Sequence, residues 1–405
     1  MPQTASAPPQ ADVPSAVLDD IVPPPPVAPS PSAPALTAPL PAPAIVICPA
    51  KAAPLDPALP DRILIVSDAW APQVNGVVRT YEGIIDVLRA QGRAVKVIGP
   101  DAFPTLPMPG YAEIAVALAP ARRLSRMIDA FAPQAVHIPV EGPLGWAARR
   151  HCRRRGLGFS TSYHTNFPAY AAVRSPRMLL APVSRAAVAL SRRFHAPAQH
   201  TYVATASIEA QLRAWGFGGR LVRLSRGVDC TLFQPGPERP RAPVPVLLYV
   251  GRLAPEKNLE GFLSLSEADT GPVRKVVVGD GPQMAALRRR FPQAEFRGTL
   301  TGAALAEAYR TADVFVFPSR TDTFGMVLTE AMAAGLPIAA HDAPGARDIV
   351  TAPELGALDA DLGRAIRRAL EAPGSRAARH ATARARFDWD AVAATFLANS
   401  AALRG

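Results

Sequence analysis

The sequence predicts an α/β protein with two doubly wound domains whose strand ends face a shared cleft. Two series of short apolar segments alternate with helical segments, the pattern of buried parallel strands and crossover helices. The proline-containing stretch Pro235–Pro245 separates them, and 405 residues suffice for two ordinary domains. We expect a tail over 1–60, domains over 61–237 and 244–387, and a terminal helix over 388–405 that packs back on the first domain.

The amino-terminal 60 residues hold 18 of the 45 prolines, including the run Pro23–Pro26. Such a segment forms few backbone hydrogen bonds and buries little surface, so we expect a disordered tail. Its start does not resemble a secretory signal, and no apolar stretch approaches the roughly 18 residues of a membrane helix. A cytoplasmic location is expected, with Cys48, Cys152 and Cys230 as reduced thiols.

The first domain begins with a βαβ unit. The apolar run Arg62–Asp68 predicts a strand buried on both faces, and Ala94–Gly99 predicts the next strand. The helix between them ends at Gly92 and is predicted by apolar residues at helical spacing: Val77, Val78, Tyr81, Ile84, Ile85 and Leu88. Further strands are expected at Ala135–Pro139, Gly158–His164 and Thr201–Ala206.

The second domain repeats this pattern. Its predicted strands are Val244–Gly251, Lys275–Gly281, Val314–Ser319 and Pro337–Asp342. Helical segments, for example Pro282–Arg290 and Ala303–Thr311, separate them. The chain closes with Asp388–Arg404, whose apolar spacing predicts an amphipathic helix.

The net charge of +11 is concentrated in two arginine-rich regions. One covers Arg149–Arg155, and the other covers Arg174–Arg193 and includes the apolar run Met178–Ala181. Basic surfaces attract polyanions, so an anionic membrane is a candidate partner, and a merely solvated face is the alternative. We expect no nucleic-acid partner, because no binding motif or aromatic stacking platform accompanies the charge.

The most informative segment is Ser319–Pro337, SRTDTFGMVLTEAMAAGLP. It begins where a predicted strand ends, at the edge of an open sheet where ligands bind. A helix that starts near Gly325 or Met326 and ends at Gly335 leaves its first N–H groups unpaired and aimed into the cleft. Such a helix end suits a diphosphate.

Two acids frame this segment, Asp322 in the loop and Glu330 in the helix. The Asp322-x7-Glu330 pattern resembles the Glu-x7-Glu signature of glycosyltransferase family 4, whose members have two Rossmann-like domains in the GT-B fold. The resemblance implies that Asp322 contacts the donor sugar and that Glu330 binds the ribose. The first acid is one methylene shorter here, which moves its carboxylate by about 1.5 Å and fits a different sugar. The segment's backbone would hold sugar and phosphate through Phe324, Gly325, Met326 and Val327.

Two cations follow the first strand of the second domain. The segment YVGRLAPEKNLEGFL places Arg252 and Lys257 there and resembles the family's Gly-Arg-x5-Lys segment. Fixed cations at this position would stabilise the negative charge that develops on a departing diphosphate. The resemblance also places Gly281, in a tight strand-to-helix turn, and Arg297 beside the nucleotide base.

Two positions in the first domain complete the expected site. Gly76 opens the first helix and would let the backbone approach the donor phosphate, although family members have more glycines there. His164 follows a strand in TSYHTNFPAY and resembles the family's active-site histidine; an ordinary structural histidine is the alternative. The segment Arg226–Pro235 resembles a signature that leads into the interdomain linker, and we interpret it as structural.

The resemblance implies a retaining glycosyltransferase that moves a hexose from a UDP- or GDP-linked sugar to a lipid or glycan hydroxyl. It implies no metal or other cofactor, because Arg252, Lys257 and a helix N-terminus take the metal's place. The leaving phosphate would accept the acceptor proton while His164 orients the sugar. The TDTFG and SYHTNF segments look most like lipid glycosyltransferases and GDP-mannose-dependent mannosyltransferases. A lipid acceptor would place the enzyme on the inner face of the cytoplasmic membrane, held by the basic region Arg174–Arg193.

Two other classes of protein are open. A nucleotide-sugar epimerase can share the architecture but needs proton-transfer carboxylates in the first domain, where Glu141 is the obvious candidate. A dinucleotide-dependent oxidoreductase is disfavoured because the turn Ser67–Gly76 lacks the G-x-G-x-x-G spacing.

Overall fold

The structure is a computed structural model that describes residues 56–401, apart from residues 57, 72, 74, 109–110, 119–120, 165–179, 239 and 241. Most of the expected tail over 1–60 therefore lies outside the described residues, as does Cys48. The same holds for the part of the basic region Arg174–Arg193 before residue 180.

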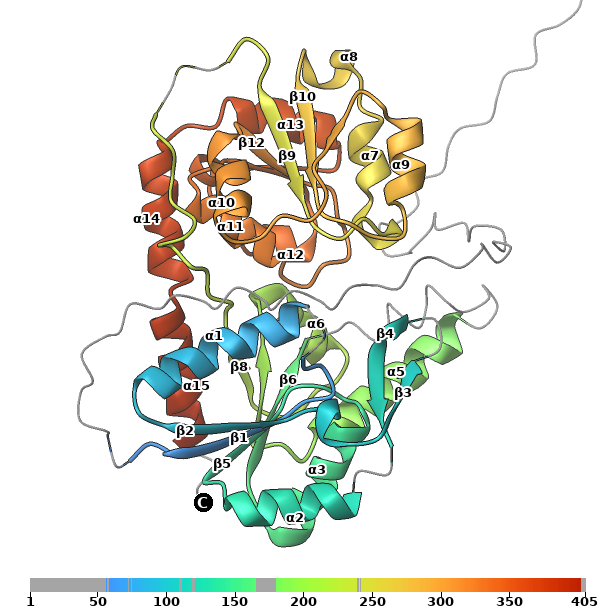
Figure 1. Ribbon diagram of the computed structural model, residues 1–405, viewed down its shortest axis with the longest axis vertical. Coiled ribbons are helices and arrows are strands. Elements are labelled where there is room, and N and C mark those ends of the chain that lie inside the picture. Colours follow the sequence, from blue (N-terminus) through green and yellow to red (C-terminus); the bar gives the residue numbers. More distant parts are fainter. Residues whose placement is uncertain are drawn as a thin grey trace, which may run out of the picture.

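The first sheet has six parallel strands, in the order β2-β1-β5-β6-β7-β8 (Figure 1). The strands are β1 Arg62–Val66, β2 Ala94–Ile98, β5 Ala135–Ile138, β6 Phe159–Tyr163, β7 His200–Val203 and β8 Leu221–Arg223. Side chains of a strand alternate between its faces. Ile63 and Ile65 accordingly pack in one apolar core, whereas Leu64 and Val66 pack in another.

Five described helices connect these strands: α1 Gly76–Ala90, α2 Ala121–Phe131, α3 Pro143–Arg155, α5 Leu180–His195 and α6 Ala206–Ala214. Helix α1 begins where the Asn75 side chain accepts hydrogen bonds from the backbone N–H of Val77 and Val78. After it ends, Gly92 takes a φ of 83°, as the sequence predicts for a terminating glycine. An antiparallel hairpin, β3 Thr105–Met108 and β4 Tyr111–Ala117, lies outside the main sheet.

The second sheet is also six-stranded and parallel, in the order β11-β10-β9-β12-β13-β14. Its strands are β9 Val246–Val250, β10 Arg274–Val278, β11 Glu295–Phe296, β12 Val314–Phe317, β13 Ile338–His341 and β14 Gly356–Asp359. Its helices are α7 Leu259–Leu263, α8 Glu267–Thr270, α9 Met284–Arg290, α10 Gly302–Thr311, α11 Met326–Ala333, α12 Pro344–Arg347, α13 Leu362–Leu370 and α14 Arg376–Arg386. Two facing Rossmann-like domains make this the GT-B fold that the sequence predicts.

The carboxyl-terminal helix α15, Trp389–Ala401, returns to the first domain (Figure 1). Its buried residues recur at helical spacing: Trp389, Val392, Ala393, Phe396 and Leu397. They join the core that contains Ile63, Ile65 and Tyr81. Gly83 and Gly227 make room for the Trp389 ring, because a Cβ at either position would lie within 2.6 Å of it. This packing ties the two domains together at the chain's end.

The sequence does not predict the hairpin, β8, β11 or β14. Strands β8 and β11 are only three and two residues long. Runs this short cannot establish a period in the sequence. They form because a neighbouring strand offers an unpaired edge.

Replacing Phe396 with alanine should destabilise the whole chain. The Phe396 ring is fully buried and contacts Tyr81, His137 and Tyr202 of the first domain. Loss of a large buried aromatic ring costs about 3–5 kcal/mol of unfolding free energy. Urea unfolding should show this loss for Phe396→Ala, whereas the exposed Thr395→Ala should stay within about 0.5 kcal/mol of the parent. Equal stabilities would contradict the packing of α15.

Candidate active site

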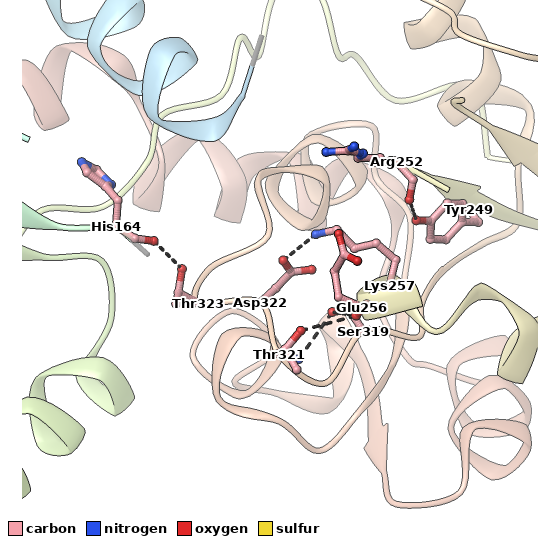
Figure 2. A network of polar contacts seen from close by, with 9 residues as sticks. All are labelled: His164, Tyr249, Arg252, Glu256, Lys257, Ser319, Thr321, Asp322 and Thr323. Carbon is pink, nitrogen blue, oxygen red and sulfur yellow. Dashed lines mark hydrogen bonds and ion pairs between the residues drawn. The ribbon is translucent and has the colours of Figure 1, made fainter. Parts of the chain in front are cut away.

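The site lies where strand ends of the two sheets approach each other. Gly76 at the start of α1 and Met326 at the start of α11 meet there: a Cβ on Gly76 would lie 3.8 Å from the Met326 sulfur. Nearby, the Thr323 hydroxyl donates to the backbone oxygen of His164 at 3.3 Å (Figure 2). The loop after β12 therefore contacts the first domain directly.

The loop between β12 and α11 is held in one shape by two glycines. Gly325 has a φ of 81°, which favours glycine, and α11 starts at the next residue. Gly345 of α12 packs under the loop, and a Cβ there would lie 2.3 Å from the Asp322 backbone oxygen. Phe324 is buried, at 5% exposure. The helix starts and ends where the sequence predicts, with Gly335 at a φ of 79° after its last turn.

Asp322 of this loop forms an ion pair with Lys257, which belongs to the segment after β9. The Lys257 Nζ donates to Asp322 Oδ1 at 2.5 Å (Figure 2). The other carboxylate oxygen, Oδ2, is buried and has no hydrogen-bond partner among the described residues. A buried acceptor without a donor is costly, so this oxygen is suited to a ligand hydroxyl.

A second set of contacts fixes the backbone that carries Lys257. Ser319 and Thr321 donate from their hydroxyls to the Glu256 backbone oxygen, at 3.3 and 3.4 Å. Arg252 lies at the end of β9, where its backbone oxygen accepts from the Tyr249 hydroxyl at 2.9 Å (Figure 2). The two predicted cations thus lie on one segment, whose backbone is hydrogen-bonded to the loop that carries Asp322.

The predicted base-binding turn packs against the same segment. A Cβ on Gly281 would lie 2.5 Å from the Leu253 backbone oxygen, so only glycine fits. The Gly279 N–H donates to the Gly298 carbonyl at 2.7 Å, which brings the Arg297 segment alongside. The Arg297 Nε itself donates to Glu295 at 2.7 Å.

Glu330 points from α11 toward the first domain. Its Oε2 accepts from the Tyr309 hydroxyl at 2.8 Å, and its Oε1 lies 3.5 Å from a guanidinium nitrogen of Arg79. Burial raises the pKa of Glu330, while Arg79 and the Tyr309 hydrogen bond lower it. Sequence reasoning missed both partners. Arg79 follows Gly76 by one turn, a spacing that could have pointed to the cleft.

His164 uses both ring nitrogens within the protein. The Arg226 guanidinium donates to Nδ1 at 2.6 Å, and Nε2 lies 3.0 Å from the Tyr81 hydroxyl. A guanidinium only donates, so Nδ1 must be the acceptor and the proton sits on Nε2. Burial and, next, Arg226 hold the pKa of His164 well below its ordinary value, which keeps the ring neutral. In this arrangement neither ring nitrogen is open to a sugar.

Arg226 belongs to the segment Arg226–Pro235, which we interpret as structural, and it contacts residues of both domains. Its guanidinium is buried and also lies 5.8 Å from the ring centroid of Phe324. Arg226 therefore joins His164 of the first domain to the loop of the second. No local motif distinguishes it from a linker arginine, because both contacts are with residues distant in sequence.

Glu141, the candidate for epimerase chemistry, forms its hydrogen bonds with residues of α5. Its Oε1 accepts from the Ser191 hydroxyl at 2.9 Å and contacts the His195 Nε2 at 2.9 Å. These contacts belong to the packing of α5 on the first sheet. They support no proton transfer in the cleft.

A cavity of about 370 Å³ is lined in part by Phe324. It is lined from both domains and from α15, for example by Thr205, Arg223, Arg386 and Thr395. Among the predicted site residues, only Phe324 lines it. This cavity is therefore not the predicted donor site.

Comparison with known proteins identifies the family. A model described as "Glycosyltransferase Family 4" matches residues 74–232, and one described as "Glycosyl transferases group 1" matches residues 244–372. A GDP-mannose-dependent alpha-mannosyltransferase of Mycobacterium tuberculosis (strain CDC 1551 / Oshkosh) is 34% identical, over 73% of this chain and 83% of that protein. The chain belongs to glycosyltransferase family 4.

Two further proteins are similar to this family 4 chain. The sulfoquinovosyl transferase SQD2 of Arabidopsis thaliana is 32% identical, over 68% of this chain and 54% of that protein. Among solved structures, sucrose-phosphate synthase from Thermosynechococcus elongatus has a TM-score of 0.65 at 21% identity, over 83% of this chain and 97% of that chain. The protein is thus a nucleotide-sugar-dependent glycosyltransferase of GT-B fold, and the oxidoreductase alternative falls away.

Among the residues that the structure describes, no helix is both long enough and apolar enough to cross a bilayer.

Replacing Gly345 with alanine should impair catalysis through the loop that it supports. The new methyl group would lie 2.3 Å from the Asp322 backbone oxygen, so the loop that carries Asp322 would have to move. A misplacement of about 1 Å can cost about 10²-fold in rate. Sugar transfer by Gly345→Ala should fall on this scale, while Gly219→Ala, where the methyl meets nothing within 4 Å, keeps the parent rate. Unchanged transfer by Gly345→Ala would disprove the role of the loop.

Proposed function

We propose that the protein is a retaining hexosyltransferase whose donor is a UDP- or GDP-linked sugar. The observation that carries this proposal is the arrangement of Asp322: one oxygen is held by Lys257 and the other is buried without a described partner. A sugar hydroxyl would supply the donor that this buried oxygen lacks. No side chain caps the adjacent start of α11, so the first backbone N–H groups of this helix would bind phosphate.

The proposed contacts cover each part of the donor, from the sugar through the diphosphate and the ribose to the base. Asp322 binds the sugar, while Arg252, Lys257 and the start of α11 bind the diphosphate. Glu330 accepts hydrogen bonds from the ribose. Gly281 and Arg297 flank the base, and Gly76 lets the first domain approach the phosphate. The remaining contacts are backbone contacts from the segment after Asp322: Phe324, Gly325, Met326 and Val327.

The reaction breaks the bond between the anomeric carbon and the phosphate oxygen and forms one to the acceptor oxygen on the same face. Charge accumulates on the departing diphosphate, where Arg252 and Lys257 stabilise it more in the transition state than in the ground state. The acceptor proton passes to a phosphate oxygen, so no protein base is needed. His164, whose pKa is lowered by burial and next by Arg226, supports this site through its backbone oxygen, which accepts from Thr323.

The sugar and acceptor are proposed from relatives and chemistry together. The mannosyltransferase relative is named for GDP-mannose, which makes this the first donor to test. SQD2 is named for sulfoquinovose, which indicates a second class of donor sugar. We infer a lipid acceptor because the first domain also carries a basic, partly apolar helix.

Removing either proposed diphosphate cation should abolish most turnover. Arg252→Ala and Lys257→Ala should each lower transfer from GDP-mannose or the preferred donor by at least about 10²-fold, the scale of a lost preorganised contact. Arg289→Ala, which removes an exposed charge from α9, serves as the matched control and should keep parent turnover. A donor panel followed by thermal shift comes first, since a bound donor stabilises the fold.

Two results would count against this site. If both cation variants retain full activity, the diphosphate lies elsewhere. If no nucleotide sugar stabilises the parent protein or is consumed by it, the proposed function itself is wrong.

The acceptor proposal predicts membrane association through α5. The described part of the basic region exposes Arg185, Arg192 and Arg193, with Leu190 54% exposed beside them. Cations with an exposed apolar side chain suit an anionic lipid surface. The protein should float with phosphatidylglycerol vesicles at low salt and be released by salt.

Charge removal on α5 provides the control. Arg185→Gln with Arg192→Gln should lower flotation, while Arg288→Gln with Arg289→Gln, an equal loss of charge from the second domain, should not. A parent protein that stays unbound at low salt would remove the membrane proposal without affecting the donor site.

A further inference from the structure

The carboxylate of Glu330 lies in a mostly buried environment. Its side chain is only 7% exposed, although an ionised carboxylate is strongly stabilised by water. Two groups compensate: the Tyr309 hydroxyl on Oε2, and Arg79 on Oε1. They come from different domains, because Tyr309 belongs to α10 and Arg79 to the first turns of α1.

These two partners differ in charge. Burial, and next the nearby Glu330 carboxylate, raise the pKa of Tyr309 far above its ordinary value, so this group is a neutral donor. Arg79 therefore supplies the opposing charge. Its side chain is 43% exposed, so it reaches Glu330 from the solvent side of the interdomain space.

The other elements packed against α11 bring no second cation to Glu330. From α14, His380 and Arg379 contact the carbonyls of Ala333 and Gly335 at the opposite end of the helix. From β13, His341 contacts the carbonyl of Ala360. Among the described residues, Arg79 is the positive charge that acts on Glu330.

We propose that Arg79 is a positioning residue that keeps Glu330 ionised, so that Glu330 can accept hydrogen bonds from the ribose. This inference rests on the proposed role of Glu330 as the ribose ligand. A carboxylate accepts at both oxygens, whereas a protonated carboxyl group presents a donor on one of them. The ionised form therefore suits two ribose hydroxyls that donate.

This arrangement links donor binding to the position of the domains. Arg79 reaches Glu330 only when the start of α1 lies against α11, the place where Gly76 and Met326 also meet. Separation of the domains would remove the positive charge of Arg79 from Glu330 and leave the Tyr309 hydroxyl as its hydrogen-bond donor among the described residues.

The test is nucleotide binding as a function of pH. Calorimetry measures GDP and UDP binding to the full chain between pH 5.5 and 8.5, for the parent and for Arg79→Gln. Without Arg79 the pKa of Glu330 rises further, so affinity should be near the parent value at high pH. Below that pKa the affinity relative to the parent should fall by up to about tenfold per pH unit. Arg79→Lys should restore the parent profile.

Proton release gives an independent measurement. Binding to Arg79→Gln near neutral pH must expel the proton from Glu330, so the heat should depend on the ionisation enthalpy of the buffer more than it does for the parent. The control is Arg89→Gln, which removes a cation from the far end of α1, where Arg89 contacts the carbonyl of Val95. It should match the parent in both measurements.

A Glu330→Gln background separates the possible outcomes. If Arg79 acts through the charge of Glu330, adding Arg79→Gln to Glu330→Gln should change affinity by less than about twofold. An Arg79→Gln defect that is the same at every pH, or that persists fully in the Glu330→Gln background, overturns the inference and indicates a direct phosphate contact. If the parent binds no nucleotide at all, the proposed function fails instead.

Discussion

The ion pair between Lys257 and Asp322 is the contact around which the site is arranged. It ties the segment after β9 to the loop after β12, which are neighbouring strands of one sheet. Parallel strands present their carboxyl ends at one edge, so the cation and the acid are brought together by topology. Lys257 contacts one oxygen of Asp322, and the other oxygen is buried without a hydrogen-bond partner among the described residues.

The first domain contributes to the candidate site through side chains and backbone groups that contact residues of the second domain. Arg226 holds His164 and lies over Phe324, Thr323 bonds to the His164 backbone, and Arg79 reaches Glu330. Apart from the contact between Arg226 and His164, which lies within the first domain, these contacts cross the space between the sheets. Helix α15 returns to the first domain and completes the connection at the chain's end.

The family assignment and the local parts of the site could be predicted from the chain. The segment from Asp322 to Gly335 carries its own helix start, acids and terminating glycine within a few turns, and the structure places that helix as expected. Arg226 could not be found in this way, because its partners His164 and Phe324 are distant in sequence. For Arg79 the spacing from Gly76 indicates the cleft, but its partner Glu330 comes from the other domain. For His164 the neighbouring sequence indicated a strand end. The occupation of both ring nitrogens depends on Tyr81 and Arg226.

The periodicity and spacing of residues along the chain were enough to predict the architecture. Apolar runs indicate buried strands, and glycines after helical segments indicate where helices end. Such signals act over a few residues, which is the range over which backbone geometry repeats. The short edge strands, the hairpin and the ionisation states of buried groups depend on tertiary contacts and could not be predicted from local sequence. Their energies arise from neighbours that are remote in sequence, and burial without a partner, as at Asp322 Oδ2, exists only once those neighbours are in place.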